Sequence, residues 1–498
     1  MLFNSYIFIF GFFPVVLAGF YLLGKNNQRL ALAWLVMASL VFYGWWNPRF
    51  LGLISVSMIF NYLTGRLLAT HKGKTGKRKI IFIFGVAINL LALCYYKYFG
   101  FLLININKIS DLSLTLPNII LPLGISFFTF TQLAFLADVY QQKSDTPRFL
   151  EYSLFVTYFP HLIAGPILHH KEMIPQFIDK SILRFNPKNM SLGLTLFAGG
   201  LVKKVVLADE VAKFANPLFN AASQGRGLTF VESWIAALSY SFQIYLDFSA
   251  YCDMACALAL MLNMKLPANF FSPYKATNII EFWKRWHMTL SRFLRDYLYI
   301  PLGGNRQGTF AQYRNIMITM FLGGLWHGAG WTFILWGILH GCYLLINHTW
   351  RSFHSHRTLM GKIPGTALTF CAVTVAWVFF RSPTIDTALN IIQGMMGFRG
   401  MGLHGAITHS VLDFPTRMAL TWLVLLAPLI FMAPNFLELF GIENTVINNR
   451  EMKHLTTSPL ISFIKWRPSL VWVLVTASLF IIGVMNLGQV SEFLYFQF

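Results

Sequence analysis

One histidine, His327, lies in an otherwise apolar stretch and is surrounded by glycines, in the segment Gly323–Gly330 (GGLWHGAG). An ionisable side chain is costly to bury in such a stretch, which makes a functional role the default hypothesis. A neutral imidazole is a suitable general base, and the glycines would let a slender acyl or pantetheine chain come close to it. A histidine that only hydrogen-bonds a neighbouring helix would give the same local pattern, so both interpretations stay open.

A basic segment, Glu281–Pro301 (EFWKRWHMTLSRFLRDYLYIP), is the second candidate. Its periodicity predicts an amphipathic helix, which would lie at a membrane interface or line a polar cavity. One stripe of this helix would contain Lys284, His287, Ser291 and Arg295. We expect His287 to point into a site, and an anionic donor such as the phosphates of coenzyme A to meet the cationic set Lys284, Arg285, Arg292 and Arg295. An interfacial helix without a chemical role is the alternative.

Carboxylates in apolar regions mark further candidates. Asp247 and Asp253 lie in the apolar segment Tyr240–Asp253, and Asp138 lies in a similar one. Carboxylates in such surroundings need partners. We expect Asp247 and Asp253 to pair with Arg292 or Arg295, or to orient a histidine; a structural ion pair and a catalytic role are both open.

No metal site is expected from the spacing of the remaining histidines and cysteines. His340 is interpreted as a packed core residue. The three histidines that flank residues 164–166 do not form a zinc motif; they are His161, His169 and His170. The five cysteines all lie in apolar segments and lack metal-ligand spacing.

The elements that must position these residues are apolar helices. Hydrophobic residues make up 56% of the 498 and charged residues 12%, whereas soluble domains contain about 25% charged residues. Apolar runs near the length that spans a bilayer recur along the chain, and about eleven to thirteen can be counted. The sequence therefore predicts an all-α integral membrane protein with transmembrane or re-entrant helices, in one multi-pass domain over residues 1–498.

The net charge of +20 lies largely in short loops between the apolar runs. We expect it to orient helices and to meet anionic lipid headgroups, with no nucleic acid as a partner. The basic loops Lys25–Arg29 and His71–Lys79 should both be cytoplasmic. Two apolar runs separate them, so the two assignments agree and place the N-terminus outside.

Eight sequence blocks together resemble the membrane-bound O-acyltransferase family, and most closely the bacterial branch with the membrane subunits of alginate and peptidoglycan O-acetylation. The resemblance extends over nearly the whole chain. The blocks are Met1–Phe10, Leu121–Phe127, Phe159–Ile167, Leu201–Ala208, Asn269–Tyr274, Glu281–His287, Arg295–Arg306 and Gly323–Gly328.

The resemblance implies a fold, a reaction and two site residues. His327 matches the family's invariant histidine and His287 matches a second histidine of this branch; the helices would surround a central tunnel. Acetyl-CoA would be the cytoplasmic donor, without a metal, and His327 would act as general base or hold the acyl group. The acetyl group would leave toward the outside of a bacterial inner membrane. There a periplasmic or membrane-anchored transferase of the SGNH type would place it on a polysaccharide.

Two other functions remain open from the sequence. One is a D-alanyl or other acyl transferase that takes its cargo from a carrier protein. The other is a transporter without chemistry, because broken helices and buried ionisable groups would suit it equally well.

Overall fold

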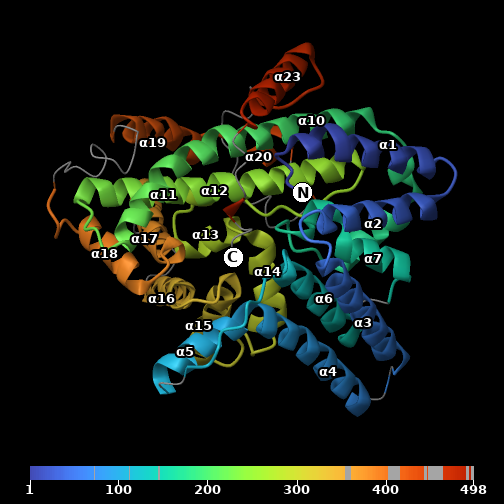
Figure 1. Ribbon diagram of the computed structural model, residues 1–498, viewed down its shortest axis with the longest axis horizontal. Helices are drawn as coiled ribbons and strands as arrows, with labels where there is room; N and C mark the ends of the chain where they lie inside the picture. Colours follow the sequence, from blue (N-terminus) through green and yellow to red (C-terminus); the bar gives the residue numbers. More distant parts are fainter. Residues whose placement is uncertain are drawn as a thin grey trace.

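Every regular element is a helix in the part of the chain that the computed structural model describes (Figure 1). The described residues are 1–498 except 72, 74, 111–112, 144–145, 354–360, 402–415, 442–445, 447–463, 489–492 and 495–498. The α-helices of the first half are α1 (Phe13–Gly24), α2 (Gln28–Gly44), α3 (Phe50–Thr70), α4 (Thr75–Leu93), α5 (Phe99–Ser110), α6 (Ile125–Tyr140), α7 (Phe149–Thr157), α8 (Phe159–Leu162), α9 (His170–Ile178), α10 (Pro187–Val202) and α11 (Asp209–Ser223).

The second half begins with the longest described helix and continues with shorter ones. Its α-helices are α12 (Phe230–Met261), α13 (Ile279–Arg285), α14 (Met288–Leu294), α15 (Thr309–His327), α16 (Trp331–Phe353), α17 (Lys362–Arg381), α18 (Ile385–Met395), α19 (Thr416–Phe431), α20 (Phe436–Phe440) and α23 (Leu470–Met485). Four wider π-helical segments adjoin α-helices, namely η1 (Ile7–Phe12), η2 (Cys94–Tyr98), η4 (Lys203–Ala208) and η6 (Arg295–Tyr299).

Helix α12 is the central helix of the molecule. It begins at a capping box, in which the Thr229 hydroxyl accepts from the Glu232 amide and the Glu232 carboxylate accepts from the Thr229 amide. Its most apolar stretch is 94% buried, because α10 packs along it on one side and α11, α17 and α18 contact it elsewhere (Figure 1). A helix that is apolar on all sides is stable only when other elements surround it in this way.

Six helical segments are long and apolar enough to cross a membrane, and four shorter apolar helices accompany them, among the residues that can be described. This agrees with the predicted all-helical membrane class. The count of eleven to thirteen spans stays a prediction, since length and composition identify fewer segments in this part of the chain.

The predicted continuous helix over Glu281–Pro301 is wrong. Helix α13 ends at Arg285, Trp286 is extended, and His287 has φ 41° and ψ 53°, in the left-handed region. Helix α14 then begins at Met288. The break rotates the following residues, so the predicted stripes do not exist on one helix face.

Candidate functional site

His327 is the last residue of α15, and glycines determine how closely this helix meets α16. A Cβ atom at Gly324 would collide with the carbonyl oxygen of Phe333, and one at Gly337 with that of Met320. These two glycines therefore permit close packing of two helices. The space beside Gly324 is occupied by backbone, so this glycine does not open a passage for an acyl chain.

Side chains from the segment η2 hold the carboxyl end of α15. The Lys97 amine donates to the carbonyl oxygens of Trp326 at 2.6 Å and His327 at 3.1 Å, and the Tyr98 hydroxyl donates to that of Leu325 at 2.8 Å. Helix ends leave such carbonyls without intrahelical partners, and a cation is favoured there. Sequence reasoning missed Lys97. Its signal was the same as that of His327, an ionisable residue in an apolar run.

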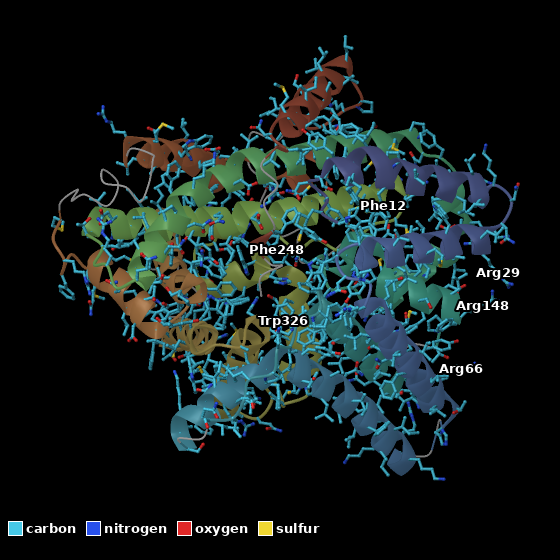
Figure 2. The ribbon with its side chains drawn as sticks, in the orientation of Figure 1. Phe12, Arg29, Arg66, Arg148, Phe248 and Trp326 are labelled. Atoms are coloured by element: carbon cyan, nitrogen blue, oxygen red, sulfur yellow. The ribbon has the colours of Figure 1, made fainter. Side chains whose placement is uncertain are left out.

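Aromatic rings enclose the imidazole of His327, which is 3% exposed. Its ring centroid lies 4.9 Å from that of Trp326, 5.0 Å from Trp336 and 5.1 Å from Phe380, each edge to face. Trp326 is itself buried, and Figure 2 labels it well within the outline of the molecule. These rings exclude water from the histidine, and a polar interaction in such surroundings is stronger than in water.

His287 reaches the same place from the break between α13 and α14. Its side chain is fully buried, and its ring centroid lies 6.5 Å from that of His327. Phe248 of α12 and Trp326 flank the ring, with centroids at 4.9 Å and 6.1 Å, and Figure 2 labels both. The structure thus brings together the two histidines that the sequence singled out.

Buried polar atoms without a partner lie on rings beside His327 and beside Trp336. Among the described residues, no partner meets the indole nitrogens of Trp283, Trp326 and Trp336 or either ring nitrogen of His340, although all are buried. Buried polar groups normally have partners, so the indole donors and the donor and acceptor nitrogens of His340 can bind a polar group that is brought into the site. His340 itself lies among aromatic rings, with centroids 4.7 Å from Trp336 and 5.2 Å from Trp283.

The four basic residues of the second candidate do not gather beside His287. Arg292 forms a two-pronged ion pair with Glu172 of α9, at 2.7 and 2.9 Å. Arg285 is buried and pairs with Glu281, four residues earlier on α13. Lys284 and Arg295 are exposed. A donor-phosphate site made from this set stays a prediction; Arg292 is partly exposed, and only Arg285 is buried.

The buried carboxylates have partners that the sequence analysis did not expect. Asp247 pairs with Lys204 at 2.7 Å, and Asp253 pairs with Lys203, so neither contacts Arg292 or Arg295 in these ion pairs. Both lysines belong to η4, which packs along α12.

A second buried carboxylate, Asp138, lies elsewhere. The carboxylate of Asp138 accepts from the hydroxyl of Tyr297 at 2.9 Å, and this hydroxyl lies 3.1 Å from Nδ1 of His169.

Of the other histidines near residues 164–166, His170 lies beside the same Asp138 carboxylate and His161 contacts backbone. His161 Nε2 lies 3.0 Å from the carbonyl oxygen of Phe155, and His170 Nδ1 lies 3.6 Å from Asp138. Within the described residues, no three His, Cys, Asp or Glu side chains meet as a metal site. The expectation that no metal takes part stays a prediction.

Two imidazoles in a dry aromatic enclosure can accept and return protons at a reacting oxygen or sulfur, which acyl transfer requires. The membrane-bound O-acyltransferase family model matches residues 40–382. A peptidoglycan O-acetyltransferase of Helicobacter pylori is 45% identical over 435 residues, which cover 81% of each chain. A probable alginate O-acetylase of Pseudomonas aeruginosa is 40% identical, over 80% of this chain and 75% of the relative.

A third relative is more distant. It is a teichoic acid D-alanyltransferase of Streptococcus thermophilus, 26% identical over 52% of this chain and 68% of its own. The family match contains both histidines and all four helices that position them, α13 to α16. The chain is a multi-pass membrane acyltransferase and belongs to the membrane-bound O-acyltransferase family.

Proposed function

We propose that this protein takes an acetyl group from cytoplasmic acetyl-CoA and passes it across a bacterial inner membrane for O-acetylation of an extracytoplasmic polysaccharide. The observation that carries the proposal is the buried histidine pair, His287 and His327, with ring centroids 6.5 Å apart. The names of the two more similar relatives, which refer to peptidoglycan and alginate, support a polysaccharide as the final acceptor.

In the proposed reaction, a hydroxyl oxygen attacks the thioester carbonyl. A C–O bond forms and the C–S bond breaks. His327 accepts the proton of the hydroxyl and returns it to the departing thiolate, so the imidazole is regenerated. Such proton transfer contributes about 10²–10⁴-fold to a rate. The indole N–H groups of Trp326 and Trp336 lie on rings next to the imidazole and can donate to the oxyanion that develops.

The immediate acceptor would be a periplasmic or membrane-anchored transferase of the SGNH type, which then acetylates the polysaccharide. Lys284 and Arg295, the exposed cations of the basic segment, are the residues proposed to meet the donor phosphates, together with Arg285 and Arg292 if their ion pairs open. A carrier-protein donor is the second candidate, because a D-alanyltransferase is among the relatives.

The test uses the purified full chain in lipid nanodiscs with acetyl-CoA labelled on the acetyl carbon. We expect release of free coenzyme A that depends on His327, with His71→Ala as control, because His71 is a partly exposed histidine outside the site. If the protein turns over only with an acylated carrier protein, then the carrier protein and not acetyl-CoA is the donor. No turnover with either donor, while the protein remains folded, would contradict the proposal.

A further inference from the structure

We infer that Asn269 is a positioning residue, which fixes the proton of His287 on Nδ1 and thereby makes Nε2 the basic nitrogen of that ring. The inference rests on the proposed function for its kinetic consequence, although the tautomer itself can be measured separately. Asn269 lies in the segment between α12 and α13, and only 2% of its side chain is exposed.

The orientation of the Asn269 amide follows from its neighbours. Its Oδ1 lies 3.3 Å from the backbone nitrogen of Thr289 and 2.9 Å from the Thr289 hydroxyl. A backbone N–H can only donate, so the amide atom that faces it must be the oxygen. The amide nitrogen points the other way, 3.3 Å from Sγ of Cys252, which is a weak acceptor. The assignment of oxygen and nitrogen therefore does not depend on the histidine.

The Thr289 hydroxyl strengthens this assignment. It accepts a hydrogen bond from the backbone N–H of Ile167 at 3.0 Å. Its own hydrogen is then available to donate, and Asn269 Oδ1 is the acceptor at 2.9 Å. Two donors from one residue thus hold the amide oxygen in place before the imidazole is considered.

The tautomer of His287 follows directly. Its Nδ1 lies 3.0 Å from Asn269 Oδ1, which has only lone pairs to offer. Nδ1 must therefore carry a hydrogen to make this hydrogen bond. A neutral imidazole has one N–H, so its Nε2 carries the lone pair. During transfer, Nε2 can accept a proton from an O–H or N–H bond as that bond breaks, and can return it later.

Backbone conformation gives a second, independent reason to place a function here. His287 adopts φ 41° and ψ 53°, which a residue other than glycine rarely does. Such strain persists only where the surroundings impose it, and it concentrates at functional sites. Asn269 imposes it here, since its backbone oxygen accepts from Met288 N at 2.9 Å and its side chain contacts both His287 and Thr289.

Two substitutions separate positioning from simple structural support. Asn269→Asp keeps an acceptor oxygen opposite Nδ1, and Asn269→Leu has a similar size without an acceptor. We expect Asn269→Leu to lower kcat by about 100-fold with the KM for acetyl-CoA unchanged, and Asn269→Asp to remain within about tenfold of wild type. A structural role alone would lower kcat only in proportion to the loss of folded protein, which thermal unfolding of both variants measures, because Leu also leaves the two Thr289 donors without an acceptor.

The control variant is Cys252→Ala, which removes only the contact on the far side of the amide and should leave kcat within about twofold. In a His287→Ala background, Asn269→Leu should cost less than about twofold more, since residues that act as a unit are non-additive. Retention of more than half the wild-type kcat by Asn269→Leu would overturn the inference, as would equal losses in the Asp and Leu variants.

A readout that needs no turnover is the ¹⁵N NMR spectrum of histidine-labelled protein, with His287 identified by subtraction of the His287→Ala spectrum. The expected wild-type ring has its proton on Nδ1, and Asn269→Leu should lose this preference. A proton on Nε2 in the wild type would refute the inference even if acetyl transfer is observed. Conversely, if the ring is protonated on Nδ1 but the protein shows no acyl turnover, the tautomer assignment stands and the proposed function is refuted.

Discussion

The anchoring of α15 by Lys97 gives a prediction with a magnitude that can be worked from the structure. Lys97→Met keeps the length of the side chain and removes the donors to the carbonyl oxygens of Trp326 and His327, now at 2.6 and 3.1 Å. Each hydrogen bond that involves a charged group contributes about 1.5–3 kcal/mol. The variant regains part of this free energy, because the methionine side chain does not carry the cost of removing an amine from water. We therefore expect a net destabilisation of about 1–3 kcal/mol.

The effect on activity should exceed the effect on stability. His327 ends the helix that Lys97 holds, and a displacement of about 1 Å in a catalytic group can cost about 100-fold in rate. The assay is acetyl-CoA turnover in nanodiscs, measured beside thermal unfolding of the same preparations. Tyr98→Phe is the matched control, because it removes one hydrogen bond to Leu325 and leaves the two carbonyls nearest the imidazole paired. A Lys97→Met protein with more than half the wild-type rate would refute the reasoning.

Three further predictions concern packing, the oxyanion and the donor. Gly324→Ala should lower the unfolding temperature strongly, because its Cβ would collide with the Phe333 backbone. Gly330→Ala is the control and should have little effect, since the nearest atom to its Cβ lies at 3.4 Å. Equal shifts of the unfolding temperature in the two variants would contradict this. Trp336→Phe should lower kcat by about 10–100-fold through loss of one N–H donor, and an unchanged kcat would remove the indole from the reaction. Charge reversal at Lys284 and Arg295 together should raise the KM for acetyl-CoA and leave kcat nearly constant; a changed kcat at constant KM would place the donor phosphates elsewhere.

The helical membrane class was predictable because it depends on composition and run length, which local sequence contains. His327 could be singled out as a candidate for the same reason, since an imidazole among apolar residues is conspicuous in the sequence. The proximity of His287 to His327 was not derivable from spacing. It came only through family resemblance, because it depends on how α13, α14 and α15 pack in space.

The misread helix over Glu281–Pro301 shows where local reasoning fails. Its residues have helical periodicity, and no glycine or proline marks a break at His287. The break depends on Asn269, which is distant in sequence and fixes the backbone at Met288 and Thr289. In general, a tertiary contact of this kind overrides local propensity, and no sequence window that excludes the contact can reveal it.

The ion pairs of α12 illustrate the same limit. A buried carboxylate must have a partner, so pairing itself could be predicted for Asp247 and Asp253. The identity of the partner could not be predicted. Lys203 and Lys204 come from a neighbouring element, and Arg292 or Arg295 would have met the need for a cation equally well.

The central claim is that His287 and His327 act as one unit in acyl transfer, and a double-mutant cycle on acetyl-CoA turnover tests it most directly. Each single alanine variant should lower the rate by about 10²–10⁴-fold, with expression and thermal stability close to wild type. The double variant should then lie within about threefold of the slower single variant. Rate losses that multiply would show that the two histidines work independently. Activity above about a tenth of wild type in His327→Ala would contradict its role as the general base.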